Sequence, residues 1–374
     1  VYELIKAFYP EAEIHTLYEN AEAEYDLRFS VEQDNDSYII KYERTENLSK
    51  QETEQKGVIS ADILSKENAG CGIQDAHALR KENKDNIKYA LYQMLVKLTG
   101  RTLPWGNLTG IRPAKLAMGM IESGMKNTEA AREMRERYLV SPQKTALAIT
   151  IANREREILK DIDYENGYSL YIGIPFCPSI CLYCSFSSYP LKVWEKRTDE
   201  YVEALCREVR ETALMMKGRK LDTIYIGGGT PTTLLPHQIR KLLDTVGEAF
   251  GYEGLAEFTV EAGRPDSITR EKLMAIREYP VTRISVNPQT MNQETLDIIG
   301  RRHTVAQTKE AFYLARELGY DNINMDLIVG LPGEDIHMVE RTLAQIRELA
   351  PDSITVHSLA VKRAARLNIF KEKY

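Results

Sequence analysis

The sequence is short of the features that build disulfide-stabilised or membrane-spanning proteins. It holds 5 cysteines among 374 residues, an odd number and too few for a disulfide framework. No apolar run approaches the roughly 20 residues that a membrane-spanning helix needs, so we expect no membrane span. The first residues, Val1-Tyr2-Glu3-Leu4, lack a signal-peptide pattern. These absences predict a cytoplasmic protein.

An excess of positive charge is missing as well. Lys and Arg number 49 and Asp and Glu 55, which gives a formal net charge of −6. Because no overall basic field would attract a polyanion, no nucleic-acid partner is expected. Hydrophobic residues make up 43% and charged residues 28%, as in ordinary globular proteins, and the length allows two domains.

Residues 1–165 predict a smaller α+β domain, whose role the sequence leaves open. Alternating apolar and polar residues over 26–44, around Asp-Asn-Asp, predict a β-hairpin. The polar segment 48–68 is interpreted as a linker or an exposed helix. Helices are expected at 76–98 and at about 113–123 and 127–161. The loop PWGNLTGIRP (104–113) is rich in Pro and Gly, and packing is favoured over a partner contact for its Trp105.

After residue 166, short β-rich runs alternate with helical segments. The runs are 169–175, 223–229, 257–263, 283–289, 322–330 and 353–359, and the helical segments are 197–217, 236–250, 267–278, 292–299, 304–318 and 336–349. Six βα units in succession predict an α/β fold, a partial (β/α)6 TIM-like barrel over 166–374. Such folds place their chemistry at the carboxyl ends of the strands.

Three cysteines fall in the run CPSICLYC (177–184), directly after the first predicted strand. Three thiolates on one short loop can bind three irons of a cubane cluster and leave the fourth iron open to a small molecule. A zinc site would need a fourth ligand, and neither His237 nor His303 lies in a second paired motif. Cys71 is far from this run, and Cys206 is interpreted as a small apolar residue of a helix.

Further polar and glycine-rich positions stand at the ends of the later strands. The second strand runs into GGGTPT (227–232), where the backbone can approach a ligand closely. Glu261, Gln289, Arg301 and Asp326 follow at or after later strands. An unpaired polar side chain in an apolar setting is costly, so ligand contact is expected, with a satisfied structural group as the alternative.

Taken together, these motifs resemble those of a known protein superfamily. The cysteine run after a first strand, with an aromatic residue before its third cysteine, resembles the radical S-adenosylmethionine superfamily. In order, YxxIPFCxxxCxYCxF, GGGTPT, EAxxP, RISxxxQ, GRRH and DLIxGLPGE resemble its oxygen-independent coproporphyrinogen III oxidase family over roughly residues 169–359. The segments PWGNLTGIRP and TVHSLAVKRAARL are similar to the coproporphyrinogen dehydrogenase branch of that family.

The resemblance implies a [4Fe–4S] cluster and S-adenosyl-L-methionine as cofactors. It implies that Cys177, Cys181 and Cys184 bind the cluster and that Tyr171 lies beside it as a catalytic residue. The S-adenosylmethionine contacts that it implies are Phe186 at the adenine, the turn Gly228, Gly229 and Thr230 at the amino group, and Glu261, Gln289, Arg301 and Asp326 along the site.

The implied reaction is the oxygen-independent oxidative decarboxylation of coproporphyrinogen III propionates to vinyl groups. It proceeds through a 5′-deoxyadenosyl radical and yields protoporphyrinogen IX for haem biosynthesis. The implied partners are the tetrapyrrole substrate and a flavodoxin- or ferredoxin-type electron donor. Cationic side chains that could bind its carboxylates, with a solvated surface as the alternative, are Arg264, Arg302, Lys362, Arg363 and Arg366.

The sequence departs from the family pattern in three places. Gly173 stands where the decarboxylases carry a histidine, and Phe186 stands where they carry a fourth cysteine. Because the given sequence ends at Tyr374, we expect it to lack the family's C-terminal accessory domain. A haem chaperone of the same family and a radical enzyme acting on another substrate therefore stay open as alternatives.

Overall fold

Two units make up the chain in the computed structural model, Val1–Asp161 and Ile162–Tyr374. The structure describes residues 1–17, 25–34, 37–47, 52–62, 76–110, 112–361 and 365–369. Cys71 therefore lies outside the described residues. The division falls in the turn before the first strand of the second unit, close to the boundary at 165 that the sequence suggests.

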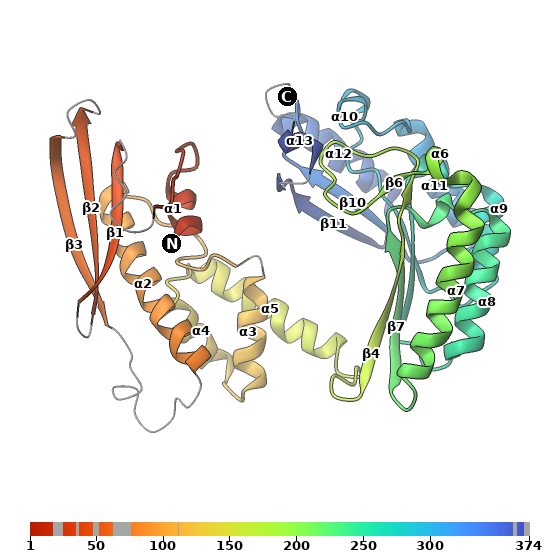
Figure 1. Cartoon of the computed structure of the whole chain (residues 1–374), viewed down its shortest axis with the longest axis horizontal. Helices are drawn as coiled ribbons and strands as arrows, with labels where there is room; N and C mark the ends of the chain where they lie inside the picture. The colour runs from red at the N-terminus through yellow and green to blue at the C-terminus, as the bar shows by residue number, and fades with distance from the viewer. Residues whose placement is uncertain are drawn as a thin grey trace. The chain divides into compact units, whose positions relative to one another are not determined.

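The first unit opens with a short helix and an antiparallel sheet. Its elements are α1 (Tyr2–Phe8), β1 (Leu27–Asp34), β2 (Ser37–Asn47) and β3 (Glu52–Asp62), in the sheet order β1-β2-β3 (Figure 1). The hairpin predicted over 26–44 is confirmed by the pairing of β1 with β2. The prediction of a linker or exposed helix over 48–68 is wrong for Glu52–Asp62, which form β3 and pair with β2, and its other positions lie outside the described residues. A strand at a sheet edge tolerates a polar sequence, so composition concealed it.

In the described part of the first unit, the sheet is followed by the helices α2 (Ala76–Thr99), α3 (Pro113–Glu122), α4 (Asn127–Glu136) and α5 (Pro142–Ile158). The single helix predicted over 127–161 is wrong. Leu139 has a positive φ of 55°, and the Ser141 side chain accepts a hydrogen bond from the Lys144 N–H at 3.4 Å, which caps a new helix. Pro142 at the first helical position suits this start.

The loop between α2 and α3 is packed, as predicted for Trp105. The Lys144 Nζ lies 5.3 Å from the centre of the Trp105 ring, and the buried Asn107 donates from Nδ2 to the Arg137 carbonyl oxygen at 3.3 Å. Trp105 also packs against the apolar core of α3, α4 and α5. The Pro- and Gly-rich sequence of this loop therefore has a structural explanation within the unit.

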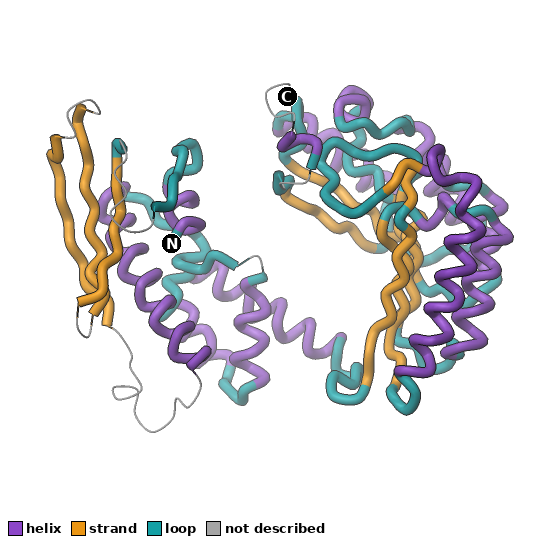
Figure 2. Tube along the Cα trace, in the orientation of Figure 1, coloured by secondary structure: helices purple, strands orange, loops and turns teal. Residues whose placement is uncertain are grey.

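The second unit is built on six parallel strands. They are β4 (Gly167–Ile174), β7 (Lys220–Gly228), β8 (Glu257–Gly263), β9 (Arg283–Val286), β10 (Ile323–Val329) and β11 (Ser353–Ser358). The sheet order is β11-β10-β9-β8-β7-β4, and each neighbouring pair is parallel. The sheet is curled, with helices on its outer side (Figures 1 and 2). The predicted α/β fold, a partial (β/α)6 TIM-like barrel, is confirmed.

The helices of this unit lie between successive strands, except the last one, which follows β11. They are α6 (Leu191–Trp194), α7 (Thr198–Met215), α8 (Pro236–Phe250), α9 (Arg270–Arg277), α10 (Gln293–Ile298), α11 (Val305–Glu317), α12 (Ile336–Leu349) and α13 (Arg366–Ile369). A small parallel ribbon, β5 (Phe176–Cys177) with β6 (Tyr189–Pro190), follows β4. Within the described part of the chain, no helix has the length and apolar character to cross a membrane.

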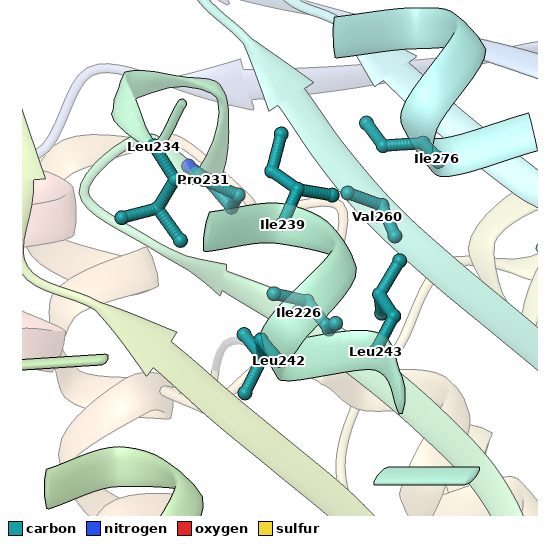
Figure 3. Close-up of a pocket in the computed structure, with 8 residues that line it drawn as sticks. All are labelled: Ile226, Pro231, Leu234, Ile239, Leu242, Leu243, Val260 and Ile276. Atoms are coloured by element: carbon teal, nitrogen blue, oxygen red, sulfur yellow. The ribbon is translucent and has the colours of Figure 1, made fainter. Parts of the chain in front are cut away.

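The apolar core lies between the sheet and these helices. Strand residues such as Ile224, Ile226 and Val260 are at most 3% exposed there and meet Leu242 and Val246 of α8. A cavity of about 20 Å³ remains in this layer (Figure 3), and its lining is entirely apolar: Ile226, Pro231, Leu234, Ile239, Leu242, Leu243, Val260 and Ile276. The cavity offers no polar group to a ligand, so it is a packing defect.

Candidate metal centre

The cysteine loop, residues 177–184, joins the two strands of the small ribbon after β4. Cys177 ends β5, and the loop turns back where the Cys184 N–H donates to the Cys181 carbonyl oxygen at 3.2 Å. All three cysteines are free thiols. A short ribbon after the first barrel strand thus presents three sulfur ligands from eight residues.

Contacts from distant parts of the chain fix this loop. The Ser179 hydroxyl donates to the Gly300 carbonyl oxygen at 2.8 Å, and the Leu182 N–H donates to the Ile299 carbonyl oxygen at 2.9 Å. The Leu367 N–H in turn donates to the Leu182 carbonyl oxygen at 2.8 Å. Because both backbone and side chain are held, the loop is positioned before any ligand arrives.

The thiols sit in surroundings that disfavour bare thiolates. Burial raises the pKa of Cys177, although the Thr230 hydroxyl opposes the rise by donating to its sulfur at 3.6 Å. Burial also raises the pKa of Cys184, opposed by the Phe186 backbone N–H and the Ser188 side chain. A desolvated thiolate needs a compensating cation, and a bound metal supplies one.

Cys181 is linked to two buried arginines, to one directly and to the other through a tyrosine. Arg264 Nη1 donates to the Cys181 sulfur at 3.8 Å. Arg301 Nη1 donates to the Tyr183 hydroxyl at 3.2 Å, and that hydroxyl is hydrogen-bonded to Cys181. Arg264 and Arg301 are each 4% exposed. The predicted site residue Arg301 therefore stands behind the cysteine loop, with its Nε unpartnered among the described residues.

The donor set suits a cluster better than a single ion. Among the described residues, no three Cys, His, Asp or Glu side chains converge on one metal position. His237 is exposed, 3.5 Å from Asp199, and His303 is fully buried with burial lowering its pKa to about 3. Neither joins the thiols. In a cubane each thiolate binds a different iron, so the three ligands need not converge.

The glycine turn after β7 packs directly on the cysteine loop. Gly228 has a φ of 104°, which favours glycine. The Gly229 N–H donates to the Ile174 carbonyl oxygen at 2.7 Å. A Cβ atom at Gly229 would lie 2.7 Å from the Phe176 carbonyl oxygen and 3.0 Å from the Cys177 sulfur. The structure thus brings together two motifs that the sequence separates, and only glycine permits the approach.

An aromatic and acidic cluster lies beside this turn. The Tyr225 hydroxyl donates to Glu261 Oε1 at 2.6 Å, and Tyr171 stacks on Tyr225 with ring centres 5.8 Å apart. Burial raises the pKa of Glu261, and the nearby charge of Asp326 adds to the rise, whereas the bonds from Tyr225 and the Gly228 backbone oppose it. Tyr171 is 61% exposed, so one ring face remains available.

Gln289, shortly after β9, meets Asp326 in the middle of β10. The Gln289 N–H donates to the Asp326 carbonyl oxygen at 3.0 Å, and Asn324 Nδ2 donates to Asp326 Oδ1 at 2.7 Å. Gln289 has a φ of 70°, and its buried Oε1 has no partner among the described residues. A non-glycine residue with positive φ and an unpaired buried amide oxygen is the pattern of a ligand-facing position.

The cationic side chains that were expected to bind substrate carboxylates differ in their burial and contacts. The proposal of Arg264 as a carboxylate anchor is wrong, because its donors are engaged by Asp266, Ser179 and Cys181. Arg302 and Arg366 are exposed, and Lys362 and Arg363 lie outside the described residues.

Phe186, two residues after Cys184, is 75% exposed and presents its ring to solvent.

Sequence reasoning missed Tyr225 and the roles of Tyr183 and Arg264 at this site. Tyr225 could have been found, since it alternates with the buried Ile224 and Ile226 on a strand that ends in the glycine turn. Tyr183 is the aromatic residue noted in the motif, without a role. The contact of Arg264 with Cys181 joins residues 83 positions apart, and no local pattern encodes it.

Comparison with known proteins agrees with this geometry. Residues 171–346 match the family model of the radical SAM superfamily. A curled six-stranded parallel sheet with a three-cysteine loop after its first strand, together with this match, defines a radical SAM protein. Over 343 residues the chain is 37% identical to the oxygen-independent coproporphyrinogen-III oxidase-like protein HemZ of Bacillus subtilis (strain 168), covering 88% of this chain and 68% of that protein. The chain belongs to the oxygen-independent coproporphyrinogen III oxidase family of that superfamily.

Two further relatives match a little over half of the chain. The heme chaperone HemW of Bacillus subtilis (strain 168) is 39% identical over 195 residues, covering 52% of this chain and 51% of that protein. The solved coproporphyrinogen III oxidase HemN from Escherichia coli aligns with a TM-score of 0.49 and 29% identity, covering 59% of this chain and 54% of that one. The chain spans about half the length of these two proteins.

The cofactors of this family are a [4Fe–4S] cluster and S-adenosylmethionine. The residues present fit both groups. Three buried or half-buried thiols without disulfides supply the sulfur ligands, and a glycine cradle that a Cβ would fill lies against Cys177. The orphaned Gln289 Oε1 offers an acceptor to a bound molecule.

Proposed function

We propose that this chain is a radical SAM oxidoreductase that decarboxylates propionate side chains of coproporphyrinogen III to vinyl groups without oxygen. The observation that carries the proposal is the convergence of the cysteine loop, the Gly228-Gly229 turn and the Tyr225–Glu261 pair. The 37% identity to an oxidase-like protein over 88% of this chain supports the choice of substrate class.

In this proposal Cys177, Cys181 and Cys184 bind the cluster. Residues of the turn and of the strand ends bind S-adenosylmethionine: Gly228, Gly229, Thr230, Glu261, Gln289, Arg301 and Asp326. Phe186, with its exposed ring, packs on the adenine, and Tyr171 faces the reacting end. When bound, the two groups supply one-electron cleavage of S-adenosylmethionine, and the protein's residues orient the reactants and exclude water.

The reaction balances with two further participants, an electron donor and a one-electron acceptor. A propionate would give up a hydrogen atom from its β-carbon to the radical that bound S-adenosylmethionine supplies, then CO2, and then one electron to a one-electron acceptor, which would leave a vinyl group. A flavodoxin- or ferredoxin-type protein donates the electron that starts each cycle. The exposed Arg302 and Arg366 are the described cations that could meet the substrate carboxylates.

An anaerobic assay tests the proposal. The protein is reconstituted with iron and sulfide, reduced, and mixed with S-adenosylmethionine and coproporphyrinogen III, and chromatography follows 5′-deoxyadenosine and the tetrapyrrole. We expect both 5′-deoxyadenosine and a divinyl product, and Cys181→Ala abolishes both. Cys206→Ala, at a fully buried cysteine of α7, is the matched control and retains both. If 5′-deoxyadenosine forms while the tetrapyrrole stays unchanged, the substrate assignment is wrong.

Haem transfer is the second candidate function. Two points favour it: Gly173 stands where the resemblance implies a histidine in the decarboxylases, and 195 residues of this chain are 39% identical to a heme chaperone. A chaperone binds haem stoichiometrically and forms no vinyl product. Spectroscopic titration with haem, run beside the product assay on the same preparation, separates the two functions.

A further inference from the structure

Arg264 is a buried guanidinium with every nitrogen engaged. It follows β8 directly and is 4% exposed. Its Nε and Nη2 donate to the two carboxylate oxygens of Asp266 at 3.0 and 2.7 Å. Its remaining nitrogen, Nη1, donates to the Ser179 carbonyl oxygen at 3.1 Å, the Ser179 hydroxyl oxygen at 2.9 Å and the Cys181 sulfur at 3.8 Å.

The arrangement fixes the direction of Nη1. A buried arginine is costly without a paired carboxylate, and the bidentate contact with Asp266 both compensates the charge and sets the plane of the guanidinium. Ser179 is held in turn by its bond to the Gly300 carbonyl oxygen at 2.8 Å. The N–H that points at Cys181 therefore has little freedom to turn away.

The three thiols receive different donors. Cys177 accepts from the hydroxyl of Thr230, and Cys184 accepts from the Phe186 N–H and from Ser188. These donors are neutral. Among the described residues, the direct cationic donor to a cysteine sulfur is Arg264, since Arg301 reaches Cys181 only through the Tyr183 hydroxyl.

We infer that Arg264 is a positioning residue that donates a charge-assisted N–H···S bond to Cys181 and raises the reduction potential of the cluster. The inference rests on the proposed function in that it needs a cluster bound by Cys181. Reduction adds negative charge to the cluster and its sulfur ligands, so a fixed cationic donor stabilises the reduced state more than the oxidised state. Asp266 moderates this effect because it places a negative charge on the far side of the same guanidinium.

The test measures the potential without S-adenosylmethionine or substrate. Wild type, Arg264→Lys, Arg264→Gln and Arg270→Gln are reconstituted anaerobically and titrated with a reductant while electron paramagnetic resonance follows the reduced cluster. We expect the ratio of reduced to oxidised cluster in Arg264→Gln to fall about tenfold at a fixed potential, which is about 59 mV for a one-electron couple. The ratio in Arg264→Lys should lie between those of wild type and Arg264→Gln. Arg270→Gln, at an exposed partner of Glu317, matches wild type.

A second variant guards against a folding failure of Arg264→Gln. Asp266→Asn keeps Arg264 and removes the compensating negative charge, so the potential should shift in the opposite direction, toward easier reduction. If Arg264 had only a structural role, Asp266→Asn would not shift the reduction potential in the opposite direction to Arg264→Gln. An unchanged or lower potential in Asp266→Asn, or a wild-type potential in Arg264→Gln, overturns the inference. Failure of wild type to bind any cluster would instead refute the cofactor assignment of the proposed function.

Discussion

The two faces of the parallel sheet differ although they share the same strands. On the helix side, Ile224, Ile226 and Val260 are buried among apolar side chains. On the opposite face, the intervening residues Tyr225 and Glu261 form a hydrogen-bonded pair. Because successive side chains of a strand point to opposite faces, one sequence serves both purposes by alternation. Substitutions should therefore separate into those that change stability and those that change chemistry.

Leu243→Ala is expected to give the largest change in stability. Leu243 is 2% exposed and already borders the apolar cavity, so truncation enlarges it. We expect a loss of about 2–5 kcal/mol in the free energy of unfolding. Denaturant unfolding of the protein without cofactors measures it, with Leu214→Ala, at a 67% exposed residue, as the matched control. Equal losses of stability in the two variants would contradict the claim that residues on the helix side of the sheet determine stability through their burial.

Gly229→Ala should affect both faces. Its Cβ would meet the Phe176 carbonyl oxygen and the Cys177 sulfur, so β5 must move away from the turn. We expect a stability loss of about 1–3 kcal/mol, as for other overpacked sites. Iron content after reconstitution should fall with it, because Cys177 is displaced. Gly119→Ala, at a helical glycine with open space around its Cβ, should leave iron content unchanged.

Glu261→Gln should act on chemistry, with a modest and pH-dependent effect on stability. The amide keeps an acceptor for Tyr225 but loses the negative charge, and we expect 5′-deoxyadenosine formation to fall about tenfold, the scale of one bond to a charged group. Glu257→Gln, earlier on the same strand, is the control. A wild-type rate in Glu261→Gln would remove this residue from the proposed site.

The sign of the pH effect follows from the raised pKa of Glu261. The folded protein binds this proton more tightly than the unfolded chain does, so ionisation of Glu261 lowers the free energy of unfolding as pH rises above its ordinary value of 4.5. Glu261→Gln removes this loss of stability, because the amide does not ionise. We expect Glu261→Gln to gain stability over wild type as pH rises from 4.5 through the folded pKa, then level off. Denaturant unfolding at several pH values measures the difference.

Local pattern predicted much of the second unit. The strand runs, the cysteine loop and the GGGTPT turn are contiguous in sequence, and the carboxyl ends of parallel strands meet at one edge, so their proximity follows. The contact of Arg264 with Cys181 did not follow, because it depends on how a loop after β8 meets a loop after β4. In the first unit, the Ser141-Pro142 helix start was readable, whereas the polar edge strand β3 was not, since its pairing is made by the backbone.

Gly173→His is expected to have the smallest effect on stability. It tests whether residue 173 alone accounts for the departure from the decarboxylase pattern. A Cβ at Gly173 would meet only Tyr171 Cε1, at 3.4 Å, and the backbone there needs no positive φ. The histidine would lie on the same face as Tyr171, so we expect a stability change within about 0.5 kcal/mol. If the missing histidine alone separates this chain from the decarboxylases, the variant should form more divinyl product per 5′-deoxyadenosine than wild type. An unchanged ratio in a well-folded variant would place the difference elsewhere on this face.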